Sequence, residues 1–306
     1  MNATPYRWAW PAFLVLALLF LGTGNGALYG VAVPLAALAI ALGVPGAMAR
    51  SPSRVDRQDL AVIGGLYISV VALFSLAFRG FTQDSVAGLF LTFAAGMLLG
   101  VVGPVVYTVW VRHRPVADLG LTRSNLRAAL ALGLVLAAVQ FAMTLWGYNL
   151  PQPVDWVPLM VLSLTVGLFE AVFFRGFIQT RLESSFGPIG GVGGASGLYA
   201  AYHVGYGMGP AEMLFLFGLG VVYGVAFAIA RNVAVLWPLL IPLGSFYNNL
   251  ESGDIRMPWA AILGFADVLA LMATSVWLAL RHQRRDAAHR RGGRPIPPQG
   301  APRARA

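Results

Sequence analysis

The residues of this 306-residue chain with the strongest capacity for chemistry stand within long apolar stretches. They are a carboxylate, Glu170, an imidazole, His203, and two adjacent amides, Asn248 and Asn249. A carboxylate and a neighbouring imidazole can orient and deprotonate a water molecule, and an amide can donate a hydrogen bond to a developing oxyanion. These residue types predict a site that activates water.

The positions of these groups along their stretches favour a common site. If each stretch is a membrane helix, all three levels lie roughly 18–23 Å from the same face at 1.5 Å per residue. Ionisable and polar groups inside a membrane are costly, and they mark function by default. We expect the Glu170 carboxylate and the His203 imidazole to lie roughly 3–6 Å apart, within reach of one shared water.

The composition indicates that these stretches cross a membrane. Hydrophobic residues make up 58% of the chain and charged residues 11%, with a mean hydropathy of +0.71. A soluble domain carries roughly 25% charged residues. Cysteine is absent, which excludes disulfides, thiolate metal sites and a cysteine nucleophile. The composition therefore excludes a soluble enzyme, a disordered chain and a secreted disulfide scaffold.

Stretches long and apolar enough to span a bilayer recur along the chain. They cover about residues 8–24, 27–48, 60–78, 86–111, 128–148, 157–181, 188–206, 211–230, 233–250 and 258–280. Arginine is concentrated in alternate connections and in the C-terminal tail, so the positive-inside rule places both termini in the cytoplasm. The predicted fold is an all-α polytopic transmembrane bundle of about ten spans.

Three regions follow from this pattern. Residues 1–59 form a two-span hairpin with a basic loop, and residues 60–280 form the membrane core. Residues 281–306 hold eight of the 21 Arg among Pro and Gly, and their composition predicts a disordered cytoplasmic tail. The net charge of +9 is located mainly at this expected cytoplasmic side, which favours membrane lipids and argues against nucleic acid as a partner.

Three sequence motifs at the candidate site resemble those of the CPBP family, which contains the CAAX prenyl proteases and the bacterial Abi proteins. Residues 167–182 read GLFEAVFFRGFIQTRL, close to the family's EExxxRG motif. Residues 199–203 read YAAYH, close to FxxxH, and residues 236–249 read LWPLLIPLGSFYNN, close to WP…HxxxN. The resemblance covers about residues 157–250.

The resemblance implies an eight-helix catalytic core, here preceded by two extra spans, and endopeptidase activity inside a bacterial plasma membrane. By position, Glu170 and His203 would activate water and Asn248 would help to stabilise the oxyanion. The implied substrate is a membrane-associated or lipidated peptide. The family is described as metalloproteases, which would imply zinc. Because potential ligands are few here, a glutamate mechanism without a cofactor is preferred.

The chain departs from the first motif at its second glutamate, which is Ala171. Arg175 has therefore lost the partner that an i, i+4 pair would supply. In an α-helix Arg175 lies about 140° round from Glu170 and should face elsewhere, either snorkelling or bonding backbone carbonyls. Asp267 is a poorly level-matched substitute partner, and we expect both Arg175 and Asp267 to be structural polar groups.

The chain also departs from the third motif, because its histidine is missing. Gly244 or Ser245 stands in its place, depending on whether Asn248 or Asn249 is the motif's amide. Ser245 is a candidate substitute donor. Loss of one oxyanion donor typically costs about 10²–10³ in rate. A histidine restored in the correct register is therefore expected to raise the rate.

Two functions stay open from the sequence. The first is an intramembrane endopeptidase of the CPBP type. The alternative is a catalytically weakened relative that binds a membrane partner or a bacteriocin-like peptide as an immunity or scaffold protein. A transporter has less support, because paired broken helices and a chain of carboxylates are absent from the pattern. The missing histidine is the feature that separates the first two.

Overall fold

The computed structural model describes residues 26–43, 55–81, 85–145, 150–252 and 259–292, and all regular structure in these ranges is helical. The elements are α2 (Gly26–Gly43), α3 (Arg57–Ser75), η1 (Leu76–Gly80), η2 (Ala87–Ala94), α4 (Ala95–Val106), η3 (Tyr107–Val111), η4 (Val116–Leu119), α5 (Leu126–Thr144), α6 (Pro153–Glu170), η5 (Ala171–Gln179), α7 (Thr180–Tyr202), η6 (His203–Tyr206), α8 (Pro210–Ala230), η7 (Val233–Val235), α9 (Leu240–Ser252) and α10 (Trp259–Gly292). The predicted all-α class is confirmed.

Several of these helices are long and apolar enough to cross a membrane. Within the described residues there are five, at Arg57–Gly80, Ala87–Val111, Pro153–Tyr206, Pro210–Ala230 and Ala261–Ala287. The chain is therefore a multi-pass helical membrane protein. The structure does not support the full count of ten spans, and the first expected span, 8–24, lies outside the described residues.

One of these helices combines two expected spans. Residues 157–181 and 188–206 are expected as separate helices, and a kink does divide the continuous helical stretch Pro153–Tyr206 between them. The chain turns at Gly187, whose φ of 77° and ψ of 170° lie outside the helical region. A left-handed φ suits glycine, which has no Cβ to clash. The kink thus separates the helix that carries Glu170 from the helix that ends at His203.

The expected span 233–250 is not one helix. The 3-10 turn η7 comes first, and α9 begins only at Leu240. Prolines at 238 and 242 lack the backbone donor that a continuous helix needs in its interior. At 13 residues, α9 reaches about 20 Å, less than the roughly 30 Å hydrocarbon core. Prediction of a single membrane-crossing helix over this range is therefore wrong.

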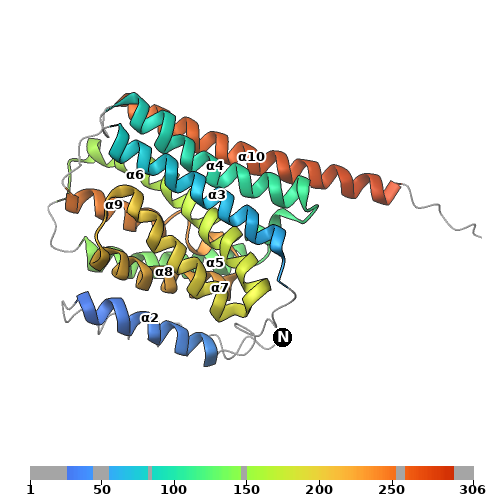
Figure 1. Cartoon of the computed structure of the whole chain (residues 1–306), viewed down its shortest axis with the longest axis horizontal. Helices are drawn as coiled ribbons and strands as arrows, with labels where there is room; N and C mark the ends of the chain where they lie inside the picture. Colours follow the sequence, from blue (N-terminus) through green and yellow to red (C-terminus); the bar gives the residue numbers. More distant parts are fainter. Residues whose placement is uncertain (1–25, 44–54, 82–84, 146–149, 253–258, 293–306) are drawn as a thin grey trace, which may run out of the picture.

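The C-terminal tail also differs from its expected state. Disorder is predicted from residue 281 onward, but α10 continues as a helix to Gly292. Alanine and arginine are both good helix formers, so the first part of the tail can extend a helix that already exists. Residues 293–306 lie outside the described part of the chain. Figure 1 shows the end of α10 projecting beyond the bundle.

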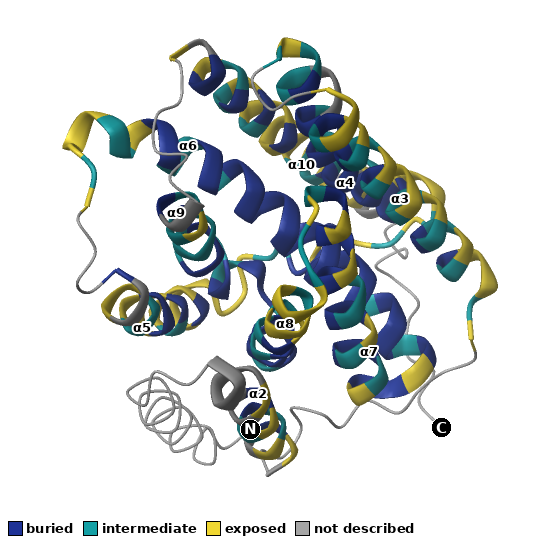
Figure 2. Cartoon of the chain, turned by 60° about the vertical axis from the view of Figure 1, so that its left-hand side comes forward, coloured by how far each residue is buried: buried dark blue, intermediate teal, exposed yellow. Residues whose placement is uncertain are grey.

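The core of the bundle forms around α6. This helix packs against α9 on one side and against α4 and α10 on the other, while α7 packs against α8, which also contacts α2. Figure 2 shows α6 in the middle of the bundle, with buried residues along most of its length. Phe169, Phe173, Phe174 and Phe177 are fully buried, so this aromatic row packs within the protein. The candidate base therefore lies at the end of the most enclosed helix.

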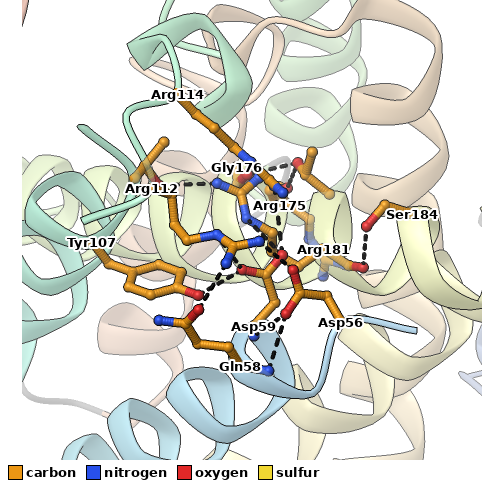
Figure 3. A network of polar contacts seen from close by, with 12 residues as sticks. Asp56, Gln58, Asp59, Tyr107, Arg112, Arg114, Arg175, Gly176, Arg181 and Ser184 are labelled. Atoms are coloured by element: carbon orange, nitrogen blue, oxygen red, sulfur yellow. Dashed lines mark hydrogen bonds and ion pairs between the residues drawn. The ribbon is translucent and has the colours of Figure 1, made fainter. Parts of the chain in front are cut away.

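A buried ionic cluster fixes one end of the bundle (Figure 3). Its centre is Asp59, near the start of α3, whose side chain is 1% exposed. The carboxylate accepts a hydrogen bond from the Tyr107 hydroxyl at 2.7 Å. It also lies near three guanidinium groups, those of Arg114 at 3.5 Å, Arg112 at 3.6 Å and Arg181 at 3.7 Å. These contacts join α3 to the C-terminal end of the membrane helix Ala87–Val111 and to the start of α7.

Candidate active site

A π-helical segment decides which way the first motif faces. The backbone changes from α to π at Ala171 and stays so to Gln179. With i→i+5 hydrogen bonds, residues five apart lie closer in direction than in an α-helix, and such segments are frequent at functional sites. The Arg175 guanidinium packs on the Tyr199 ring, and Tyr199 packs against Tyr202, whose hydroxyl bonds Glu170. The α-helical geometry assumed for this segment therefore does not apply.

Arg175 is enclosed between α7 and α8. Its side chain is 1% exposed, so it does not snorkel to a membrane surface. One guanidinium nitrogen, Nη1, donates to the Ser196 hydroxyl at 3.4 Å, and the group lies 5.2 Å from the centre of the Tyr199 ring. The other terminal nitrogen, Nη2, has no hydrogen-bond partner among the described residues. The arginine thus stays beside the candidate base without the carboxylate that Ala171 has replaced.

Glu170 lies in a shell of tyrosines. The carboxylate belongs to a residue that is 5% exposed, and it accepts a hydrogen bond from the Tyr202 hydroxyl. Tyr199 packs against Tyr202, with 5.7 Å between ring centroids. A buried carboxylate held by a hydrogen bond has a defined direction, which a general base needs. Tyr202 therefore orients Glu170 within the protein interior.

His203 lies in the same aromatic cluster. Its imidazole is centred 4.0 Å from the Tyr202 ring and 5.1 Å from the Tyr199 ring. Nδ1 lies 2.9 Å from the Tyr199 carbonyl oxygen. Because a carbonyl only accepts, Nδ1 carries the proton, and Nε2 of the neutral ring is then an acceptor. Tyr202 thus contacts both candidate residues, with its hydroxyl on Glu170 and its ring on His203.

Of the third motif's amides, Asn248 does not face the protein interior as expected. Asn248 is exposed on α9. Asn249 is half-buried and donates to the carbonyl of Ser245, one turn earlier, at 2.8 Å. The structure therefore places Asn248, the expected oxyanion donor, at the surface of the chain. These positions follow from the late start of α9, which sets the rotation of the helix.

Asp267 is the remaining polar residue of the sequence prediction. It is exposed on α10. An exposed carboxylate cannot hold two helices together in the way that a buried one does. The prediction that Asp267 is a structural contact, or a substitute partner for Arg175, is therefore not supported.

Polar groups from two other helices surround Gly244, one of the two positions at which the motif's histidine is expected. A Cβ atom at this position would lie 2.8 Å from the Gln140 amide and 3.1 Å from the Tyr223 hydroxyl. The amide fits best when its nitrogen donates to the Leu240 carbonyl and its oxygen accepts from the Gly244 N–H, both at 3.1 Å. Gln140 of α5 and Tyr223 of α8 thus occupy the space that the side chain of a histidine at position 244 would need.

This arrangement reverses the expectation for Gly244→His. We expect the substitution to destabilise the protein by about 1–3 kcal/mol, because an added side chain must displace two packed polar groups. Thermal unfolding of the purified protein in detergent measures the effect. Gly65→Ala is the control, since nothing lies within 4 Å of a Cβ atom there. A Gly244→His protein as stable as the wild type would show that the space is open.

Tyr199, Tyr202, Tyr223 and Gln140 are the residues that sequence reasoning missed. Charged groups are the strongest signal of a functional site inside an apolar stretch, whereas these side chains are neutral. Polar side chains inside apolar stretches were available as a signal, since such residues are expected to face the bundle interior. Only the structure shows that they meet, because they come from three different helices, α5, α7 and α8.

The residues around Glu170 do not fit a zinc ion. A catalytic zinc site holds the metal with three protein ligands and leaves a fourth position for water. Among the described residues, no group of three or more His, Asp or Glu side chains is placed to hold a metal ion. Here Glu170 and His203 are instead engaged with tyrosines and a backbone carbonyl.

Comparison with known proteins supports the motif assignment. A family model described as Rce1-like, type II CAAX prenyl endopeptidase, matches residues 151–241. The match includes Glu170 and His203 and ends before Gly244. No curated protein and no solved structure matches the chain. The match confirms the resemblance seen in the motifs, because residues 151–241 are similar to an Rce1-like domain of the CPBP type.

Proposed function

We propose that the protein is an intramembrane endopeptidase in which Glu170 is the general base. The observation that carries the proposal is the enclosed Glu170 carboxylate, held by Tyr202, with the His203 ring packed on the same tyrosine. The match to a family of peptidases supports the reaction class. A fixed base and an imidazole acceptor on adjoining helices suit the activation of one water molecule.

The proposed reaction follows from these groups. Nε2 of His203 accepts a hydrogen bond from the water, and the Glu170 carboxylate takes a proton as the water oxygen bonds to the scissile carbonyl carbon. The carbonyl oxygen becomes an oxyanion. When the C–N bond breaks, Glu170 returns the proton to the leaving amine. Tyr202 keeps the carboxylate in place during both transfers, and no step requires a metal.

The finer features of the proposal concern the substrate and the membrane. We take the substrate to be a membrane-associated or lipidated peptide, since the matched family is named for prenylated substrates. Glu170 and His203 both lie within Pro153–Tyr206, which is long and apolar enough to cross a membrane. Such a peptide would therefore reach the site by lateral diffusion in the bilayer. We keep the bacterial plasma membrane and an eight-helix core as parts of this proposal.

A cleavage assay tests the proposed function. Purified protein in liposomes is given a library of quenched fluorescent peptides, with and without a farnesylated C-terminal cysteine motif. We expect cleavage of a subset, and loss of that cleavage in Glu170→Gln. A protein that binds peptides from the library but cuts none, with its cellular phenotype intact in Glu170→Gln, would support the alternative of a binding relative.

The orientation in the membrane has its own test. We expect a cytoplasmic C-terminus, because eight Arg in the tail exceed the positive charge of every predicted outer connection. Alkaline phosphatase fused to the C-terminus, which is active only outside the cytoplasm, should be inactive. The same enzyme inserted between Gly80 and Ala87, in a predicted outer connection, should be active. The reverse pattern would overturn the orientation.

A further inference from the structure

The proposed reaction needs a donor for the oxyanion, and the expected one is missing. The motif's histidine is absent, with Gly244 or Ser245 in its place, and the amide of Asn248 is exposed. Removing an oxyanion donor costs about 10²–10³ in rate, so an active enzyme requires a replacement. Two side chains, Gln140 and Tyr223, reach the place that the imidazole would occupy.

Gln140 is committed to the backbone of α9. Its amide nitrogen donates to the Leu240 carbonyl, and its amide oxygen accepts from the Gly244 N–H. These are the two backbone groups that one helical hydrogen bond would join. The amide therefore supports α9 at Gly244. Of the two side chains, Tyr223 is the one whose hydroxyl suits a substrate, because the phenol can donate without releasing this part of the helix.

Tyr223 belongs to the shell around Glu170. Its side chain is 1% exposed, and its ring lies edge-on to Tyr199 at 6.4 Å between centroids. Tyr199 in turn contacts His203 and packs against Tyr202, which bonds Glu170. The Tyr223 hydroxyl lies 3.1 Å from the point where a Cβ at Gly244 would stand. Tyr223 on α8 thus contacts Tyr199, near Glu170, and also lies beside Gly244.

Arg175 gives this hydroxyl a cationic neighbour. The guanidinium and the Tyr223 ring both lie against Tyr199, at 5.2 Å from its ring centre and at 6.4 Å between ring centres, respectively. The guanidinium approaches α8 closely because Gly220 and Gly224 leave room, and a Cβ at either glycine would lie 3.2 Å from a guanidinium nitrogen. Ala171 stands in place of the second glutamate, so that position supplies no carboxylate to this arginine. A nearby positive charge favours negative charge on the substrate oxygen and strengthens donation from the phenol.

We propose that the Tyr223 hydroxyl, supported by Arg175, donates the hydrogen bond that stabilises the oxyanion, in place of the missing histidine. Tyr223 keeps its proton throughout the reaction. The proton still passes from the water to Glu170 and from Glu170 to the leaving amine. The two departures from the motif are then linked: loss of the second glutamate leaves Arg175 available to the tyrosine, and loss of the histidine leaves Gly244 open to it. The inference rests on the proposed peptidase function.

The test compares Tyr223→Phe, Tyr67→Phe and Glu170→Gln on one farnesylated quenched peptide that the wild type cleaves. Tyr67→Phe is the matched control, since it removes a hydroxyl that donates to the Leu198 carbonyl at 3.0 Å, outside the cluster. We expect Tyr223→Phe to lower kcat by about 10²-fold. KM, and the affinity for a reduced-amide analogue of the peptide, should change by less than about threefold.

The outcomes separate the two proposals. Wild-type kcat in Tyr223→Phe, with Glu170→Gln inactive, would overturn the donor role and leave the peptidase proposal standing. Activity in Glu170→Gln would overturn both. If Tyr223→Phe does not fold, 3-fluorotyrosine at position 223 keeps the packing and makes the phenol a stronger donor. A raised kcat then supports the role, and an unchanged kcat overturns it.

Discussion

Glu170→Gln is expected to lower the rate of peptide cleavage by about 10²–10⁴-fold, the usual contribution of a general base. Glutamine keeps the size of the side chain and one acceptor oxygen for the Tyr202 hydroxyl, but it cannot take a proton from water. The protein should therefore fold as the wild type does. Single-turnover cleavage of the quenched peptide in liposomes, alongside thermal unfolding in detergent, measures both quantities.

Glu212→Gln is the matched control for this substitution. Glu212 is exposed at the start of α8, where its carboxylate accepts from the Gly209 N–H at 2.7 Å. Glutamine can keep that capping contact, so activity and stability should both be retained. His203→Ala should resemble Glu170→Gln, since it removes the acceptor that orients the water. Cleavage by Glu170→Gln at the wild-type rate would remove Glu170 from the mechanism.

Asp59→Asn is expected to destabilise the protein by about 3–5 kcal/mol, the cost of breaking a buried ion pair by removing one partner. The carboxylate is 1% exposed, and Arg181 beside it is also 1% exposed. Asparagine leaves the guanidinium of Arg181 in the interior without its counter-charge. Thermal unfolding or chemical denaturation of the purified protein in detergent should show the loss, with the peptide assay as a second readout.

Asp56→Asn is the control, because it makes the same change nearby in a partly exposed position. The Asp56 carboxylate caps α3 by accepting from the N–H groups of Gln58 and Asp59, and it pairs with Arg112. Asparagine is an equally good cap, and a surface ion pair contributes only about 0–1 kcal/mol. Equal stability of the two variants would contradict a structural role for the buried cluster.

Several features could be predicted from residue types and order alone. The scarcity of charge and the long apolar stretches predict a helical membrane protein, because hydrocarbon excludes unpaired backbone and charge. Glu170 and His203 could be selected because ionisable residues inside such stretches are rare and costly. The motifs around them led to the family that the comparison confirms. All of these properties can be read locally along one segment at a time.

Spatial relations between segments could not be predicted in this way. The positions of Glu170 and Arg175 relative to each other depend on a change from α to π geometry, which the apolar pattern of the segment does not reveal. The exposure of Asn248 depends on where α9 begins, two residues after Pro238 and with Pro242 in its first turn. An α-helical wheel drawn through these segments assigns the wrong faces.

The sequence by itself determined the membrane class, the all-α fold and the two residues at the centre of the candidate site. Only the tertiary structure decided which side chains surround Glu170 and His203. Gln140, Tyr223 and Gly244 lie on three helices that are distant along the chain, and their meeting depends on how those helices pack. The periodicity of one helix predicts which face is buried, but it holds no information about which partner that face will meet.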